Sequence, residues 1–509
     1  MKKNNEKVEK SLKLLAKSST IVLIGVILSK IFTYIYRVII ARHFGPEIYG
    51  LFTLAFMVTG IFTSLIFFGL GEGLLRFIPL FRGKKEINKI RYVFKFSVKF
   101  LFFSSLLGGL LLFLLADTIS IKIFHNEGLI IFLKIFSLSI PFSIFLGIFL
   151  SIIRSFEKIS GHSFISNILQ PAINVLFLIF LIFLGMKVNS VIFSHLLSVI
   201  VTLSLAFFFC KHKLPKIFKK EHLKKETKKF IKRMLISYSW PIMFAGIIGT
   251  IFYWADSFVI GFFENAKSVG YYNAAIPIVM LLMLVPSLFT QLFAPLITRE
   301  FSKRNREIIK EISKQVVKWI FILNLPLFIL MFIFPGTIIN ILFGKDYLIA
   351  TNALRILSIG GILSSPVYIF NSLLFMIGKS RLFLANLIIS SSVNIFLNVV
   401  LVPKYSITGA ALATAISWIL LTLILFFETK RYLDIIPLRR KMFRVLLASI
   451  IPTILALYLR ANLTASLISL VSCSFLFILL YVFSMFLTGS LDKNDVMILR
   501  TIKRKIISR

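Results

Sequence analysis

Two cations stand inside the first long apolar run of the sequence, where a charge is expensive to keep. Lys30 and Arg37 are seven residues apart, which places them on one face of a helix about 10 Å apart along its axis, with Tyr34 between them. Charged side chains within a membrane-spanning helix normally face a cavity or a partner. The spacing therefore predicts that Lys30, Tyr34 and Arg37 contact an anionic ligand. Alternatively, Lys30 extends to the membrane surface and Arg37 marks the outer interface.

A second pair of cations occupies equivalent positions in two similar segments. Lys134 lies in "LKIF" (133–136) and Arg355 lies in "LRIL" (354–357), each near the start of an apolar run. Two such groups related by a repeat would flank a central path for a phosphate, which the arginine fork binds through two hydrogen bonds. The alternative interpretation is that both are interfacial anchors at the beginning of a helix.

Asp256 is the one carboxylate well inside the seventh apolar run. Three roles are compatible with a buried acid at this depth. It pairs with Arg37 as an outer gate, it binds a coupling cation such as H⁺ or Na⁺, or it forms a purely structural ion pair.

The remaining titratable residues give no pattern typical of an enzyme. The six histidines have no metal-ligand spacing, the 20 Asp and Glu residues lie mainly in loops, and no phosphate-binding loop of the nucleotide-hydrolysing kind occurs. The two cysteines, Cys210 and Cys473, form no disulfide framework. We therefore predict no catalytic residue, no metal and no other cofactor.

The elements that must position these residues are membrane-spanning helices. The chain has 509 residues, 58% of them hydrophobic, whereas soluble domains contain roughly 45–50%. A helix crosses the hydrocarbon core with about 20 apolar residues, and lipid requires every backbone polar group to be bonded internally. The class predicted is an all-α, multi-pass membrane protein of about 14 spans. The predicted spans are 18–40, 51–75, 92–115, 129–153, 163–184, 189–210, 236–261, 270–297, 315–335, 350–376, 380–401, 407–427, 445–460 and 464–488.

The net charge of +39 has a distribution that predicts orientation. Most of the 59 Lys and Arg residues fall in alternate loops, which face one side of the membrane if there are fourteen crossings. The positive-inside rule then places both termini in the cytoplasm and the chain in the cell membrane. Because this explains the excess charge, nucleic acid is not predicted as a partner, and membrane lipid is.

The two halves of the chain repeat each other at an offset of about 220 residues. "GLFTLA" (50–55) falls on "GYYNAA" (270–275), and Asn174 falls on Asn394. Each copy has six spans, so the copies share an orientation and are related by an axis along the membrane normal. We predict a central cavity between the two bundles and alternating access by rocking one against the other. Spans 13 and 14 have no counterpart and are expected to pack outside this core.

These features define six predicted segments. A basic cytoplasmic arm (1–17) precedes an N-lobe (18–210), and a basic linker (211–235) precedes a C-lobe (236–427). The last two spans and the loop before them occupy 428–488, and a basic tail follows (489–509).

Three segments resemble a known family. "YRVIIARHFGPEIYGLFTLA" (36–55), "ILFGKDYLIATNALRILSIGG" (341–361) and "SVNIFLNVVLVPKYSITGAALATAIS" (392–417) are similar to those of polysaccharide-transport flippases of the multidrug/oligosaccharidyl-lipid/polysaccharide exporter superfamily. The resemblance implies translocation of an anionic, lipid-linked oligosaccharide on a polyprenyl pyrophosphate for cell-surface glycan synthesis. It carries no residue roles with it. The alternatives are a drug/cation antiporter of the same superfamily and a membrane glycan polymerase or ligase.

Overall fold

The computed structural model describes residues 2–462 and 466–490, and in these ranges its secondary structure is helical, without β-strands. Within the described ranges, twelve helical segments are long and apolar enough to cross a membrane. Two of the twelve contain a break, α1 (Lys2–Phe67) at Gly45 and α14 (Ser380–Leu433) at Ser406. Counting both sides of each break gives fourteen spanning stretches, so the predicted class is confirmed. Most of the basic tail, residues 491–509, lies outside the described residues.

The chain divides into two compact units, residues 1–270 and 271–509. The first unit contains α1, α2 (Leu70–Gly83), α3 (Ile87–Thr118), α4 (Gly128–Ser155), α5 (Ile159–Ser163), α6 (Gln170–Phe183), α7 (Asn189–Lys213), α8 (Lys225–Phe263) and the start of α9 (Ala266–Ser302). The second contains the rest of α9, α10 (Arg306–Ile333), α11 (Pro335–Phe343), α12 (Thr351–Ser364), α13 (Val367–Met376), α14, α15 (Lys441–Asn462) and α16 (Leu467–Leu487).

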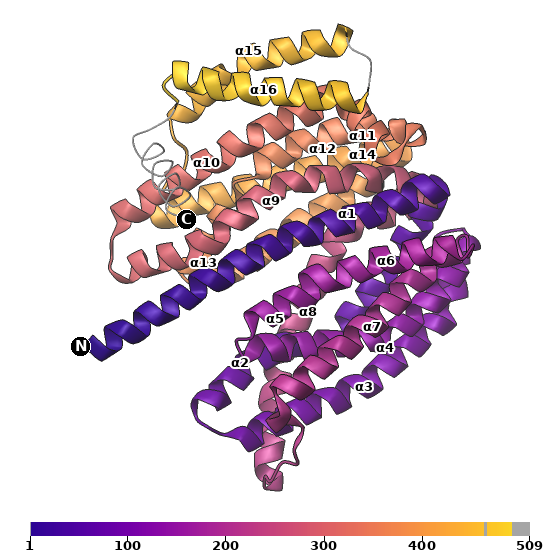
Figure 1. The fold of residues 1–509 in the computed structure, drawn as a ribbon, viewed down its shortest axis with the longest axis vertical. Helices are drawn as coiled ribbons and strands as arrows, with labels where there is room; N and C mark the ends of the chain where they lie inside the picture. Colours follow the sequence, from indigo (N-terminus) through magenta and orange to yellow (C-terminus); the bar gives the residue numbers. More distant parts are fainter. Residues whose placement is uncertain (1, 463–465, 491–509) are drawn as a thin grey trace. The chain divides into compact units, whose positions relative to one another are not determined.

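The first unit is a bundle in which α4 is central, packed against α1, α3 and α7 (Figure 1). Helix α8 also belongs to this unit, because it packs against α1, α2 and α3. Gly69, directly before α2, makes the approach of α8 possible, since a Cβ atom there would lie 2.4 Å from the carbonyl oxygen of Ser239. The compact units thus differ from the predicted repeats by one helix, and the lobe boundaries at 210 and 236 remain a prediction.

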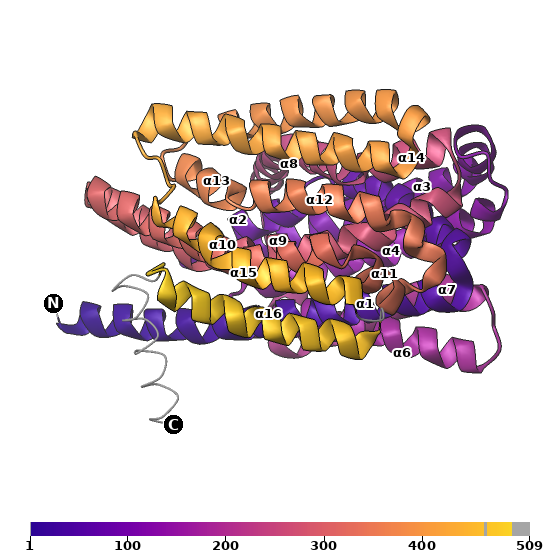
Figure 2. The ribbon, with the colours of Figure 1, turned by 90° about the horizontal axis from the view of Figure 1, so that it is seen from above.

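In the second unit, the two additional C-terminal helices lie side by side. Helices α15 and α16 run alongside each other in both ribbon views and pack against α10 (Figures 1 and 2). Phe477 and Tyr481 of α16 are buried in this contact, and the Tyr481 hydroxyl donates to the carbonyl oxygen of Ile322 on α10 at 3.2 Å. An apolar core and a buried hydroxyl with an acceptor together hold the pair on its unit.

Turn positions provide structural evidence for the repeat. Helices end at residues with positive φ, and four of these in the first half have a counterpart 219 to 221 residues later. The pairs are Lys85 with Arg304, His125 with Gly344, Glu157 with Gly378, and Lys187 with Ser406. Since a left-handed backbone conformation is uncommon outside glycine, this agreement in spacing supports the predicted duplication.

One contact between the two repeats is reciprocal: each repeat contributes a glycine that packs on the equivalent segment of the other, as a twofold relation requires. A Cβ atom on Gly50 would lie 1.7 Å from the carbonyl oxygen of Ala266, and a Cβ atom on Gly270 would lie 2.0 Å from that of Pro46. Gly50 and Gly270 are 220 residues apart, and so are Pro46 and Ala266. Each glycine therefore packs on the equivalent backbone of the other copy, and neither position has room for a side chain.

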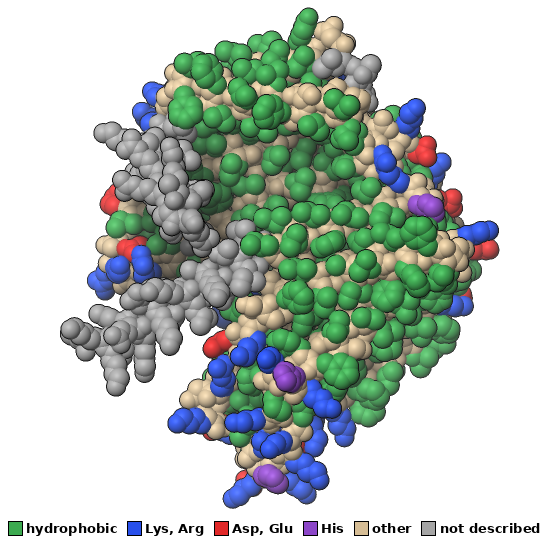
Figure 3. Space-filling model, viewed as in Figure 1, with side chains coloured by type: hydrophobic (Ala, Val, Ile, Leu, Met, Phe, Trp, Pro, Cys, Tyr) green, Lys and Arg blue, Asp and Glu red, His purple; other side chains and the backbone are tan. Residues whose placement is uncertain are grey.

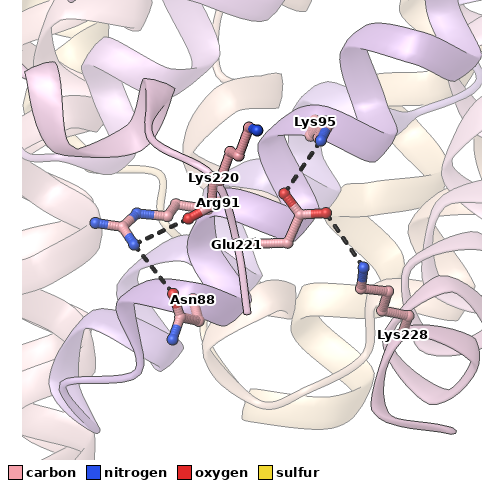
Figure 4. Close-up of polar contacts among 6 residues, drawn as sticks. All are labelled: Asn88, Arg91, Lys95, Lys220, Glu221 and Lys228. Atoms are coloured by element: carbon pink, nitrogen blue, oxygen red, sulfur yellow. Dashed lines mark hydrogen bonds and ion pairs between the residues drawn. The ribbon is translucent and has the colours of Figure 1, made fainter. Parts of the chain in front are cut away.

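The basic linker is folded onto the first unit. Arg91 of α3 donates to the carbonyl oxygens of Lys216, at 2.8 Å, and Lys220, at 3.2 Å. The Glu221 carboxylate, only 8% exposed, forms ion pairs of 3.3 Å with both Lys95 of α3 and Lys228 of α8 (Figure 4). One carboxylate thus joins the linker to two helices.

This arrangement predicts a specific dependence of stability on pH. The pKa of Glu221 lies below its ordinary value because the carboxylate accepts hydrogen bonds from its own backbone N–H, and from Lys95 and Lys228, which together outweigh the effect of burial. Its stabilisation is therefore complete above its unfolded pKa of about 4.3 and is lost as the pH falls through the lower folded value. We expect wild type to melt at a higher temperature than Glu221→Gln at pH 7, with the difference shrinking below about pH 4.3.

The control for this measurement is Glu226→Gln, which removes an exposed carboxylate from the same segment. Thermal unfolding of the full chain in detergent should show no pH-dependent difference between this variant and wild type. A gap between wild type and Glu221→Gln that persists unchanged to pH 3 would contradict the assignment.

Candidate functional site

A cavity of about 600 Å³ lies within the first unit, between α1, α4, α6 and α7. Its walls combine hydroxyl, amide, imidazole, guanidinium and aromatic side chains. The lining residues are Thr33, Tyr36, Arg37, Phe52, Phe56, Thr59, Gly60, Thr63, Ser64, Phe67, Ser143, Gly147, Gln170, Pro171, Asn174, His195 and Val199. None of these is Asp or Glu, so Arg37 gives the cavity a positive charge that no acid in its lining cancels.

Arg37 is held in place by a neutral acceptor. Its guanidinium donates to the hydroxyl of Tyr49, which is fully buried on the other side of the break at Gly45. Tyr34 and Tyr253 lie close enough for their hydroxyls to interact with the same charge. The hydrogen bond orients the fork and leaves its remaining N–H groups for a ligand, because a guanidinium has five donors.

Besides the charge of Arg37, the cavity contains neutral amide and hydroxyl groups that can form hydrogen bonds. Gln170 and Asn174 are one turn apart on α6, and the Asn174 amide oxygen accepts a hydrogen bond from Ser198 of α7. This fixes the amide orientation, so the Nδ2 donors of Asn174 are the atoms that remain for a ligand. Thr59 is 6% exposed, and its hydroxyl has no hydrogen-bond partner among the described residues. A buried polar group without a partner is costly, and a bound hydroxyl would satisfy it.

Aromatic rings form an apolar face beside these polar groups. Phe56 packs edge-on to His195 at 5.6 Å between ring centroids, and Phe136 contacts the same imidazole at 4.9 Å. Tyr36 is held by a 3.0 Å hydrogen bond with Ser194. The cavity therefore presents rigid aromatic surface together with groups that can both donate and accept hydrogen bonds.

A second cavity, of about 370 Å³, adjoins the first through the shared residues Ser64, Phe67 and Gly147. Its lining includes Glu72 and Arg154. The polar interior of the first unit thus continues past the end of α1, where Phe68 and Gly69 break the helix with positive φ.

The predicted cations of the first unit lie in different surroundings. Lys30 is exposed on α1, near enough to Arg37 for their charges to interact, and Tyr34 is half-buried beside Arg37. Lys134 forms a 2.9 Å ion pair with Asp117 across the turn between α3 and α4, and lines neither described cavity. This pairing favours the anchor interpretation of Lys134.

The other two predicted site residues are placed as follows. Arg355, in the second unit, donates from Nε to the carbonyl oxygen of Phe332 at 3.3 Å, which ties α12 to α10. Asp256 on α8 is 6% exposed and so is buried as predicted for an acid inside a span. Their proposed roles in gating, ion coupling and phosphate binding remain predictions.

Sequence reasoning missed Thr59, Gln170 and His195 as parts of a site. The available signal was the spacing of Gln170 and Asn174, which puts two amides on one face of an otherwise apolar helix. The structure places Asn174 between helices, through its bond to Ser198. Its counterpart Asn394 donates to Thr414 at 3.2 Å, across the break in α14.

Comparisons with known proteins agree with this architecture. Residues 15–299, more than half of the chain, match the model of the polysaccharide biosynthesis protein family, and residues 241–400 match the MatE model. The chain is 28% identical over 234 residues to a probable low-salt glycan biosynthesis flippase of Haloferax volcanii, covering 46% of this chain and 48% of that one. It is 24% identical to a putative O-antigen transporter of Shigella flexneri, over 76% of this chain and 90% of that one.

A solved structure of the lipid II flippase MurJ, in an inward closed conformation, has the same fold. The TM-score is 0.71 at 20% identity, covering 91% of this chain and 97% of the other. Together with the matches to the polysaccharide biosynthesis protein and MatE models, this fold is that of the multidrug/oligosaccharidyl-lipid/polysaccharide exporter superfamily, a class of multi-pass membrane transporters. Within it, the chain belongs to the polysaccharide biosynthesis protein family.

Proposed function

We propose that this protein is a flippase that moves a polyprenyl-pyrophosphate-linked oligosaccharide across the cell membrane by alternating access. The observation that carries the proposal is Arg37, a cation held by Tyr49 in a cavity whose lining contains no acid. A diphosphate entering a spanning region needs such a charge, because hydrocarbon cannot solvate it. The relatives named as a glycan flippase and an O-antigen transporter support the same substrate class.

The cavity chemistry suits the rest of such a substrate. Sugar hydroxyls both donate and accept hydrogen bonds, as do Gln170 and Thr59, while the C–H face of a sugar ring packs on aromatic rings such as Phe56. The polyprenyl tail stays in lipid. Lys30 and Tyr34, beside Arg37, are proposed to guide the diphosphate toward it.

The other predicted residues have secondary places in this proposal. Arg355 would bind phosphate, and Asp256 would act as a gate or bind a coupling H⁺ or Na⁺. Lys134 is the least supported, since Asp117 already pairs with it. Both termini are proposed to be cytoplasmic. The variants Lys219→Cys and Lys122→Cys, at two exposed positions, test this orientation, because a membrane-impermeant thiol reagent should label them from opposite sides of the membrane.

The direct test is flipping by the purified protein in liposomes, with a polyprenyl-diphosphate-linked sugar whose headgroup is modified only when it reaches the outside. We expect transport above that of protein-free liposomes. A drug/cation antiporter would instead exchange a cationic dye for H⁺ or Na⁺ and leave the lipid-linked sugar in place. A polymerase or ligase would lengthen the glycan. Either of these results without flipping would overturn the proposal.

The two amides of α6, Gln170 and Asn174, which we call the amide wall, give a more specific prediction. The double variant Gln170→Ala/Asn174→Ala removes two neutral hydrogen-bonding groups, each worth about 1 kcal/mol, so the KM for the sugar-bearing lipid should rise about 30-fold. Transport of the polyprenyl diphosphate without a sugar should be unchanged. Both are measured in the same liposome assay.

Asn189→Ala is the matched control, because Asn189 is an exposed amide at the start of α7 and lines neither described cavity. Equal losses for the sugar-bearing and sugar-free lipids would show that the two α6 amides act on the fold, and would contradict their role in sugar binding.

A further inference from the structure

The basic linker has a folded structure in which several apolar side chains pack on the first unit. Leu214 and Ile217 are buried, and Phe218 packs against Phe94 of α3 at 5.3 Å and against Phe207 of α7 at 5.9 Å between ring centroids. Arg91 and Glu221 add the polar contacts described above. The linker therefore holds a defined position on the first unit.

The charged side chains of this segment face outward. The carboxylate of Glu221 uses both oxygens on Lys95 and Lys228, so it does not neutralise the surface. Ten other cations of residues 211–233 are exposed, and none forms an ion pair with a described carboxylate. We call them the basic platform: Lys211, Lys213, Lys216, Lys219, Lys220, Lys224, Lys225, Lys229, Lys232 and Arg233.

Basic side chains gather at the end of the first unit where this segment lies (Figure 3). Helix α8 is 39 residues long, or about 58 Å, about twice what the hydrocarbon core requires. Trp240 and Phe244 are exposed on the apolar part of α8, and tryptophan is typical of the membrane interface. The first turns of α8 therefore extend beyond the core, at the level of the lipid headgroups. Phe230, 68% exposed, interrupts the cations there.

We infer that the basic platform is a binding surface for anionic phospholipid headgroups of the membrane in which the protein lies. A polybasic surface next to a spanning helix gains about 1 kcal/mol per Lys or Arg from anionic lipid. The platform offers lysines at fixed positions around one folded segment, and an exposed phenylalanine for the acyl boundary. This role does not depend on the transported substrate.

A lipid surface explains the observations better than a nucleic acid does. Single strands are bound on several stacking aromatic rings along a basic groove. Beside the platform, Phe218 is 38% exposed and packs against Phe94 and Phe207, so Phe230, 68% exposed, is the more accessible ring of the described linker segment. The platform also lies around the first turns of α8, which extend beyond the hydrocarbon core to the level of the lipid headgroups.

The test uses the full-length protein, equilibrated with equal amounts of phosphatidylglycerol and phosphatidylcholine, and native mass spectrometry to count retained lipids. Wild type should retain phosphatidylglycerol preferentially. The variant Lys219→Gln/Lys220→Gln/Lys224→Gln/Lys225→Gln should lower the ratio of the two lipids about tenfold or more at low salt. Thermal unfolding of each variant verifies that it is folded.

The matched control removes four exposed cations from the second unit, with the substitutions Arg304→Gln, Arg306→Gln, Lys430→Gln and Arg431→Gln. Its net charge changes by the same amount, and we expect a smaller loss than in the platform variant, because these cations lie beside the ends of separate helices and not around one folded segment. An equal loss in this control would show that total charge, and not the platform, retains the lipid, and would overturn the inference.

The variant Glu221→Gln distinguishes lipid binding by the folded platform from lipid binding by net charge alone. This variant raises the net charge by one, yet retention of phosphatidylglycerol should fall, because the linker loses its ties to Lys95 and Lys228. An unchanged or higher retention would overturn the inference. So would displacement of the lipid by an equal concentration of inorganic phosphate, or tighter binding of a single-stranded oligonucleotide than of phosphatidylglycerol.

Discussion

Arg37→Ala is expected to lower the rate of flipping of a polyprenyl-diphosphate-linked sugar by about 10- to 100-fold, since each hydrogen bond to a charged group contributes about 1.5–3 kcal/mol. The loss should be similar for the sugar-bearing lipid and for the bare polyprenyl diphosphate, because the guanidinium binds the phosphates that both contain. This distinguishes it from the amide wall, whose effect depends on the sugar. The measurement is the liposome assay at matched protein content.

Three further variants separate charge from geometry. Arg37→Lys keeps the charge but loses the planar fork, so it should recover only part of the activity. Tyr49→Phe removes the acceptor that orients Arg37 and should cause a smaller loss. Lys122→Gln, which removes an exposed cation outside both described cavities, is the control. Full activity of Arg37→Ala would show that the phosphates bind elsewhere.

The fold class could be predicted from the sequence because each span is a local property of about 20 residues. The repeat could also be predicted, since a duplicated helix keeps its turn positions. The agreement of His125 with Gly344 shows this, because a histidine and a glycine occupy the same place in the two copies and share a positive φ. No sequence match marks that pair, so the backbone preserves the duplication where the side chains do not.

The site could be predicted only in part, because a cavity depends on which helices become neighbours. Arg37 was recognisable from its charge alone. Thr59 and His195 look like ordinary helix residues until α1 and α7 face each other. Lys134 illustrates the same limit from the other side: its charge suggested a path for phosphate, and the sequence did not show that Asp117 on the preceding helix pairs with it. An ion pair across a helical hairpin is the simpler way to keep a cation in a membrane protein.

Gly50→Ala and Gly270→Ala should each destabilise the protein by about 1–3 kcal/mol, the range of overpacking in a closely packed contact. The added methyl group would meet a backbone carbonyl, at 1.7 Å for Gly50 and 2.0 Å for Gly270, and a backbone cannot move aside as a flexible side chain can. The helix starting at Pro46 and the first turn of α9 must then separate. The free energy of unfolding in mixed detergent micelles measures the effect.

Because this contact is reciprocal, we can also predict how the two substitutions combine, and not only that each one destabilises the protein. If both glycines sit on the same twofold contact, the first substitution already separates the helices, so the double variant should cost clearly less than the sum of the two single variants. Gly249→Ala, in a part of α8 with no atom within 4 Å of the new methyl group, should instead stabilise the helix by up to about 1 kcal/mol. Additive losses at Gly50 and Gly270 would mean that the two positions are independent, and the structural relation between the repeats at this point would then be wrong.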